Sequence, residues 1–419
     1  MSGAESTSPW RNRDFAILWS GQAISLLGES ITVLALPLIA IAVLDSSTFG
    51  ISLLAAAASL PWLIVSLPAG VIVDRVRRRT VMLCCNIGRG AILLTVPLAV
   101  FADVVSIWQL CVVACLSGCL NVFFSSAYLS YPATLLRKEQ LVSASSMVVT
   151  ATSFASLAGP GVAGLLIGRF GAGRAILVDV FSYLVSSVSL LFIRHRQPRP
   201  QRPHGANRSF RREMAGGLRL VVADRILVMI TASNALGNFL LAAINAILLP
   251  YAVRELNWSV QTVGLILGIG AGGGLAGSLC ATNLIKRYGM VRVLLFSQLF
   301  FAPGQVTLAL VAPGLSGQII AAVGLCLTLA SAIIYNVAQR SYRVISCPPD
   351  DLGKMNATVS WLQAGLRPIA ALVGGLLGTV LGLRPTILVL ACLLPIGIVM
   401  LWLSPLRSQY RSERAAATA

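Results

Sequence analysis

Residues 70–79 read Gly-Val-Ile-Val-Asp-Arg-Val-Arg-Arg-Arg, and they lie where one long apolar segment, residues 49–73, gives way to the next, residues 80–101. Each segment has the roughly 20 apolar residues that a helix needs to cross a bilayer core about 30 Å thick. Asp74 ends the first segment, and four basic residues follow it within five positions. This pattern indicates two membrane-spanning helices joined by a positively charged loop, in which Asp74 can pair with Arg78 near the low-dielectric boundary.

The composition extends this conclusion to the whole chain. Of the 419 residues, 57% are hydrophobic and 11% are charged, whereas a soluble domain carries about 25% charged residues. This excludes a disordered protein, a coiled coil and an ordinary soluble enzyme. We predict an all-α membrane protein with twelve transmembrane helices. Their expected limits are 15–43, 49–73, 80–101, 106–128, 141–167, 175–193, 226–253, 260–284, 293–311, 317–337, 357–381 and 385–403.

The basic residues predict how these helices are oriented. Of the 32 Lys and Arg residues, 26 fall in the two tails and in the gaps that follow even-numbered helices, and only four fall in the other gaps. Positive residues concentrate on the cytoplasmic side of membrane proteins. We therefore expect both termini in the cytoplasm and the chain in the cell inner (plasma) membrane. The same pattern explains the net charge of +18 without a nucleic-acid partner.

The two halves of the chain resemble each other. Gly171-Ala-Gly-Arg174-Ala-Ile-Leu-Val recurs about 210 residues later as Gly382-Leu-Arg384-Pro-Thr-Ile-Leu-Val. The alternative is a chance likeness between glycine-rich helices. We predict two pseudo-symmetric six-helix bundles, residues 1–193 and 226–419, joined by a basic cytoplasmic linker, residues 194–225. A Pro/Arg-rich stretch, residues 196–203, opens the linker, and an amphipathic stretch, residues 210–222, follows it. Such parallel repeats are typical of transporters in which two halves rock about a central site.

The loop at residues 70–79 resembles the G-x-x-x-D-R-x-G-R-R signature of the major facilitator superfamily. The segment from Phe15 to Glu29, the pair Val178-Asp179 and the stretch Gly365-Leu-Arg-Pro368-Ile resemble the branch of multidrug, macrolide and siderophore exporters. The resemblance implies a gating role for the loop and for a Gly-Pro motif in the fifth helix. The residues concerned are Gly70, Asp74, Arg75, Arg78, Gly159 and Pro160.

Two acids within the expected spans are candidates for proton coupling. An ionised side chain at the bilayer centre costs about 2.5–3.5 kcal/mol on insertion scales, so Glu29 and Asp179 each suggest a function. Gln22, Ser25, Glu29 and Thr32 fall on one face of the first helix, as expected for a helix that lines a wet cavity. The alternative for Glu29 is a structural pair with Arg89, and the alternative for Asp179 is an interfacial position.

The seventh helix carries a second polar stripe. Asn234, Asn238 and Asn245 fall within about 40° on the helical wheel, and by resemblance this helix and the first line the cavity. Interhelical hydrogen bonding is the alternative for these asparagines. Weaker cavity candidates are Tyr128, Tyr335 and Asn336. Two basic residues lie within spans: Arg89, and Arg367, which we expect to meet carbonyls freed by Pro368.

No motif indicates a cofactor or a metal. Gly268-Ile-Gly270-Ala-Gly272-Gly273 matches a dinucleotide signature but lies inside an apolar span, so we interpret Gly264, Gly268 and Gly272 as sites of close helix packing. Cys111, Cys115 and Cys119 share one helix face but have no His or carboxylate neighbours, and no ATP-binding motif is present. We therefore predict that the protein is not an enzyme and binds no cofactor.

These observations predict a monomeric secondary transporter in the lipid bilayer that exports small amphipathic compounds, of drug, macrolide or siderophore type, in exchange for protons. An uncoupled facilitator or lysolipid flippase is the alternative. A non-transporting membrane sensor is a third possibility, but the short tails leave little room for a signalling domain.

Overall fold

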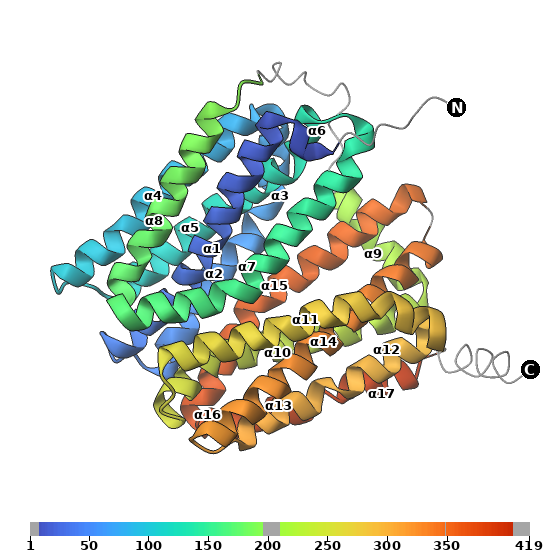
Figure 1. Ribbon diagram of the computed structural model, residues 1–419. Helices are drawn as coiled ribbons and strands as arrows, with labels where there is room; N and C mark the ends of the chain where they lie inside the picture. The colour runs from blue at the N-terminus through green and yellow to red at the C-terminus, as the bar shows by residue number, and fades with distance from the viewer. Residues whose placement is uncertain (1–7, 196–209, 348, 405–419) are drawn as a thin grey trace, which may run out of the picture. The chain divides into compact units, whose positions relative to one another are not determined.

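The computed structural model describes residues 8–195, 210–347 and 349–404, and within these ranges the chain is built of helices without strands (Figure 1). The helices are α1 (Arg13–Ala42), α2 (Thr48–Ile64), α3 (Ser66–Arg75), α4 (Arg78–Phe101), α5 (Ile107–Ser130), α6 (Pro132–Leu135), α7 (Leu141–Phe170), α8 (Ala172–Phe192), α9 (Phe210–Ala223), α10 (Arg225–Pro250), α11 (Val260–Tyr288), α12 (Met290–Leu299), α13 (Phe301–Leu310), α14 (Leu315–Ser346), α15 (Pro349–Leu381), α16 (Leu383–Leu393) and α17 (Ile396–Trp402). Short 3₁₀ turns at Pro9–Arg11 and Lys138–Gln140 and a π-helical turn at Tyr251–Glu255 complete the described chain.

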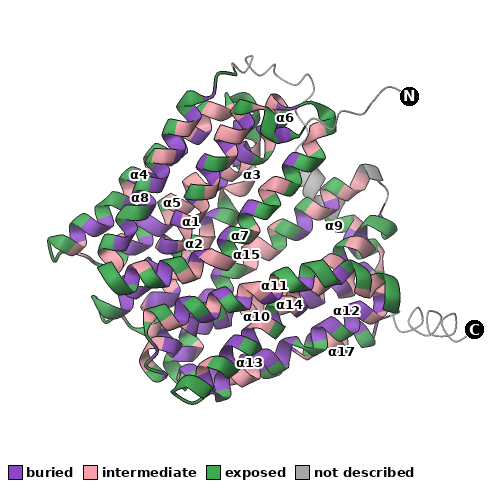
Figure 2. Ribbon diagram, viewed as in Figure 1, coloured by how far each residue is buried: buried purple, intermediate pink, exposed green. Residues whose placement is uncertain are grey.

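The predicted fold class is confirmed. Among the described residues, 11 helices are long and apolar enough to cross a membrane, or 12 if the bent pair α2 and α3 forms one span. Many large apolar side chains of these helices are exposed, as expected for a protein whose solvent is lipid. Figure 2 shows exposed residues along the helices of each unit.

Prolines explain two interruptions that hydropathy alone does not reveal. A proline lacks the N–H that bonds the carbonyl four residues earlier, and its ring clashes with that carbonyl. Pro68 lies four residues after Ile64, the last residue of α2, and the chain bends there by 59°. Pro303 lies four residues after Leu299, the last residue of α12, and divides the ninth span into α12 and α13.

Several helices run past the apolar limits expected from the sequence. The α11 helix continues to Tyr288, α14 continues to Ser346, and α15 begins at Pro349. The added turns hold polar and basic residues such as Lys286 and Arg343. Hydropathy marks only the part of a helix that lies in the hydrocarbon, whereas the backbone hydrogen bonds continue beyond it.

Contacts divide the chain into two compact units. Unit 1 comprises residues 1–46 and 57–204, and unit 2 comprises residues 47–56 and 205–419. The first residues of α2 therefore group with unit 2, which differs from the predicted bundle of residues 1–193. Helix α9 occupies the amphipathic part of the predicted linker, and the Pro/Arg stretch, residues 196–203, lies outside the described residues.

Glycines set the closest helix packing in unit 2, where α11 lies against α14. A Cβ atom at Gly277 would lie 2.5 Å from the carbonyl oxygen of Ala330, and one at Gly273 would lie 2.2 Å from that of Cys326. The sequence placed the packing stripe on Gly264, Gly268 and Gly272. Gly264 and Gly268 are buried in α11, and close packing at these glycines stays a prediction.

We expect Gly277→Ala to lower the thermal stability of the protein in detergent micelles, because the new methyl group meets backbone that cannot move without separating the helices. Overpacking of this kind costs about 1–3 kcal/mol. Gly274→Ala is the matched control, since its Cβ would lie 3.6 Å from the nearest atom, an ordinary contact. Equal apparent melting temperatures for the two variants would contradict the packing argument.

Candidate functional site

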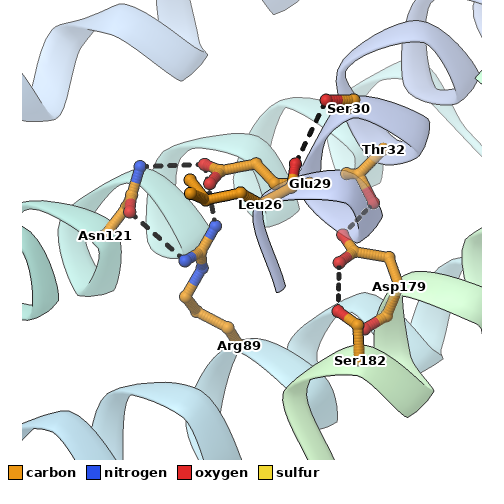
Figure 3. Close-up of polar contacts among 8 residues, drawn as sticks. All are labelled: Leu26, Glu29, Ser30, Thr32, Arg89, Asn121, Asp179 and Ser182. Carbon is orange, nitrogen blue, oxygen red and sulfur yellow. Dashed lines mark hydrogen bonds and ion pairs between the residues drawn. The ribbon is translucent and has the colours of Figure 1, made fainter. Parts of the chain in front are cut away.

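A polar cluster inside unit 1 draws residues from four helices. Glu29 belongs to α1, Arg89 to α4, Asn121 to α5 and Asp179 to α8 (Figure 3). Helix α1 packs along α8, and α4 packs against both α5 and α8. Gly28 permits the close approach of α1, since a Cβ atom there would lie 2.6 Å from the Asp179 Oδ1 atom. The cluster therefore forms where the helices of unit 1 meet.

Glu29 and Arg89 form an ion pair. The Arg89 Nη2 atom lies 3.0 Å from the Glu29 Oε1 atom, and the Asn121 side chain donates to the same oxygen at 3.0 Å. Arg89 Nη1 donates to Asn121 Oδ1 at 3.2 Å, and the guanidinium lies 4.5 Å from the centre of the Tyr183 ring. Arg89 is 5% exposed. Glu29 thus supplies the counter-charge to a buried guanidinium.

Asp179 has a different environment. It is 0% exposed, and its carboxylate accepts hydrogen bonds from the hydroxyls of Thr32 and Ser182, the latter at 3.0 Å (Figure 3). In the described part of the chain, no basic side chain lies within ion-pair distance of it. The structure therefore buries the Asp179 carboxyl group among the helices of unit 1. Neutral donors alone hold its carboxyl group.

The other predicted residues of the first helix and Tyr128 are also inside unit 1. Gln22 and Ser25 are buried, and the Gln22 Oε1 atom has no hydrogen-bond partner among the described residues. Tyr128 stacks on Phe124, with ring centres 6.0 Å apart. Apolar neighbours from α1, α4 and α5 surround that ring, so it fills the core in place of lining an open space. A cavity role for these residues stays a prediction.

A second polar cluster, in unit 2, is built of amides and hydroxyls. It lines a small cavity of about 40 Å³ with Ser233, Asn234, Gln298, Tyr335 and Asn336, which leaves room for a few water molecules. Gln298 donates to Ser233 at 2.7 Å, and the Tyr335 hydroxyl donates to the Ile230 carbonyl at 3.3 Å. No charged side chain lines this cavity.

Two groups in this cluster have hydrogen-bonding capacity to spare. The Asn234 Nδ2 donor and the Gln298 Oε1 acceptor are buried and have no partner within the described ranges. Asn238 donates to both the backbone and side-chain oxygens of Asn234. Asn245 does not join the cluster, because it is exposed on the surface of α10. The predicted asparagine stripe therefore divides, with its first two members at the cavity.

The residues assigned to gating lie apart from both clusters. Asp74 and Arg78 are 3.6 Å apart, and the Asp74 side chain is 65% exposed, so this pair contributes at most about 1 kcal/mol to stability. Arg75 is exposed, and a Cβ atom at Gly70 would meet nothing within 4 Å. A gating role of this loop stays a prediction.

Gly159 and Pro160 lie within α7, which packs on α1. A Cβ atom at Gly159 would lie 2.2 Å from the Ser30 Oγ atom, so only glycine permits this approach. Arg367 is exposed on α15, and no hydrogen bond or ion pair joins it to another described residue. Its exposure differs from the expected contact with carbonyls near Pro368.

Sequence reasoning missed Asn121, Gln298 and the link between Thr32 and Asp179. Asn121 and Gln298 are amides within apolar spans, the same signal that selected Asn234. No signal in the sequence pairs Thr32 with Asp179, because the two residues are 147 positions apart. Among the described residues, no group of three or more His, Cys, Asp or Glu side chains could hold a metal ion.

Comparisons with known proteins agree with this architecture. The chain is 22% identical to the macrolide efflux protein A of Streptococcus pyogenes, over 91% of this chain and 93% of that protein. It is 23% identical to the multidrug efflux pump Tap of Mycolicibacterium fortuitum, over 94% of this chain and 95% of that protein.

Solved structures show the same fold. The nucleoside transporter NupG aligns with a TM-score of 0.74 at 13% identity, covering 96% of this chain and 99% of that one. A bacterial homologue of the iron transporter ferroportin, in its inward-facing state, aligns with a TM-score of 0.73 at 15% identity, covering 93% and 98%. The family model for the Major Facilitator Superfamily matches residues 18–346 and again residues 231–419. The chain therefore belongs to the Major Facilitator Superfamily, a family of membrane transporters.

Proposed function

We propose that this protein exports amphipathic organic compounds in exchange for protons, with Asp179 as the group that carries the proton. The relatives that are named as macrolide and multidrug efflux proteins support the export of such compounds. The observation that supports the proton coupling is the cluster of two carboxyl groups and one guanidinium in unit 1, in which Arg89 and Asp179 are buried and Glu29 is partly buried.

The charges of this cluster do not balance when both acids are ionised. Glu29 and Asp179 are the acids of this cluster, and Arg89 is its base. An ionised carboxylate that is buried without a counter-ion costs several kcal/mol. One proton removes the excess charge, so the cluster is built to hold one exchangeable proton.

The hydrogen bonds of the cluster favour Asp179 as the carrier of that proton. Glu29 already shares its charge with Arg89 and with the Asn121 amide. Asp179 is held by the hydroxyls of Thr32 and Ser182, which can accept a hydrogen bond as readily as donate one. Protonation of Asp179 therefore changes the direction of a hydrogen bond without breaking an ion pair.

Helix α1 connects this event to movement. Thr32 bonds Asp179 and Glu29 pairs with Arg89, and the two α1 residues are three positions apart on one side of the helix. Gain or loss of the proton alters how α1 is held against α8. Coupling then requires that protonation and substrate binding favour different arrangements of the transporter.

The amide cluster of unit 2 supplies a complementary substrate contact. Asn234 offers a donor and Gln298 offers an acceptor, both without partners among the described residues. Neutral amides suit the hydroxyl and carbonyl groups of an amphipathic compound, and the absence of charged side chains at this cavity disfavours recognition through an ion pair.

The proposal is tested by substrate transport into proteoliposomes that carry an imposed pH gradient. We expect Asp179→Asn to abolish acceleration by the gradient while downhill substrate movement persists, because the amide cannot release a proton. Ser182→Ala is the control that alters a neighbouring hydroxyl and retains the acid. Wild-type transport that is equally fast with and without the gradient would instead favour an uncoupled facilitator or lysolipid flippase.

Substitutions of the ion pair separate structure from coupling. We expect Glu29→Gln to destabilise the protein by about 3–5 kcal/mol, since a buried arginine cannot lose its charge. Arg89→Gln leaves a carboxyl that can take up a proton, so it should destabilise less, and the double variant should be more stable than Glu29→Gln alone. Apparent melting temperatures give this order. The exposed pair provides the control, because Asp74→Asn should change stability by at most about 1 kcal/mol.

Loss of the Gln298 acceptor should weaken substrate binding without affecting the proton. We expect Gln298→Leu to raise KM by about 2- to 12-fold, the effect of one hydrogen bond worth about 0.5–1.5 kcal/mol, and to preserve the response to the pH gradient. Gln305→Leu is a matched control, because Gln305 is also buried but does not line the cavity. An equal rise in KM for both variants would argue against substrate contact at Gln298.

A further inference from the structure

A large cavity in unit 2 is separate from both polar clusters. It has a volume of about 580 Å³ and is lined by residues of α11, α12 and α14, including Leu284, Tyr288, Arg292, Phe296, Phe300 and Ile334. We call it the α12 pocket. Its volume lies within the range of about 300–1,000 Å³ that is usual for small-molecule sites, and its walls are mainly apolar.

The helix packing explains why this space is open. Helices α11 and α12 each pack against α14 but make few contacts with each other, and Figure 1 shows α14 between them. Pro303 breaks the span, so α12 ends at Leu299. The next residue, Phe300, lines the pocket at the far end of α12 from Arg292. Phe296 and Phe300 are 53% and 51% exposed, so the wall that α12 provides also faces the surroundings. In a membrane protein those surroundings are lipid tails.

One end of the α12 pocket is basic. Arg292 lines the pocket in the first turn of α12, and Lys286 and Arg287 lie in the last turn of α11. Residues 256–349, which include all of α11, α12 and α14, contain five basic residues and no Asp or Glu. The distribution of positive residues places this end on the cytoplasmic side. The local charge therefore favours an anion at the inner surface of the membrane.

The depth of the pocket matches one leaflet. Arg292 and Phe300 are eight residues apart along the chain, which corresponds to about 12 Å of helix. This length is similar to half the thickness of a bilayer core, which is about 30 Å in all. The α12 pocket is apolar, opens toward lipid and is basic at its cytoplasmic end. This arrangement matches the apolar tail and anionic head of a phospholipid in the inner leaflet.

We propose that the α12 pocket binds an anionic phospholipid, with an acyl chain against Phe296 and Phe300 and the phosphate group near Arg292 and Arg287. Basic pockets between transmembrane helices on the cytoplasmic side bind such head groups. The proposal is independent of proton coupling, because all of the residues involved belong to unit 2. It predicts that the protein retains one class of lipid selectively.

Native mass spectrometry of the purified full-length protein tests this selectivity. The probes are phosphatidylglycerol and zwitterionic phosphatidylcholine with identical acyl chains. We expect retained phosphatidylglycerol in excess over phosphatidylcholine, and we expect Arg292→Gln to weaken that binding by about fivefold, the effect of one surface cation on anionic lipid. Arg287 is exposed, so Arg287→Gln should fold normally and tests a second basic residue of the proposed phosphate site. Lys138→Gln, at an exposed basic position in unit 1, is the matched control and should retain wild-type binding.

The position of the lipid is tested by photo-crosslinking with phosphatidylglycerol that carries a diazirine in its acyl chain. We expect labelled peptides from α12 and α14, with labelling reduced in Arg292→Gln and unchanged in Lys138→Gln. Labelling confined to other helices, or equal retention of both lipids by all variants, would overturn the proposal. So would displacement of the label by a transported drug together with no preference for phosphatidylglycerol, since that result would make the pocket part of a substrate path.

Discussion

Arg89 places a full positive charge inside unit 1, and much of the arrangement of that unit follows from the need to balance it. A guanidinium cannot lose its proton in a protein, so its burial requires an acid, hydrogen-bond acceptors or an aromatic face. The structure provides all three, in Glu29, Asn121 and Tyr183. These groups come from α1, α5 and α8, which means that one charge on α4 holds four helices in register.

The two units solve the problem of polar groups in a membrane differently. Unit 1 uses charged groups, namely Glu29, Arg89 and Asp179. Unit 2 has amides and hydroxyls around its small cavity, and between Glu255 and Glu413 the only acids are Asp350 and Asp351, near the start of α15. A similar fold in each half therefore carries different chemistry. In the proposed function, the charged groups of unit 1 respond to protons and the amides of unit 2 contact the substrate.

The sequence predicts the spans well and the contacts between them poorly, for physical reasons. Hydropathy reports the length of helix in hydrocarbon, so it finds each span but misses the breaks that Pro68 and Pro303 cause and the polar turns beyond the membrane. Helical periodicity shows which residues of one helix share a face, and it assigned Glu29 and Thr32 to the same face of the first helix. It cannot say which helix faces them. The pairing of Glu29 with Arg89 was therefore one alternative among others, and the burial of Asp179 could not be foreseen from its place near a helix end.

The position of Asp179 illustrates how packing can turn a residue near the edge of a span into a buried one. Asp179 lies in the second turn of α8, where a carboxyl on an isolated helix would reach water. Gly28 lets α1 approach α8 closely, because a residue with a Cβ atom at this position would clash with Ser182 and Asp179. The approach seals the carboxyl from solvent and brings Thr32 within bonding distance. A movement of α1 away from α8 would reverse both effects at once, admitting water and removing a donor. Access to the acid and the strength with which it is held are thus linked through one helix contact, and such a link is what exchange of a proton between two sides of a membrane requires.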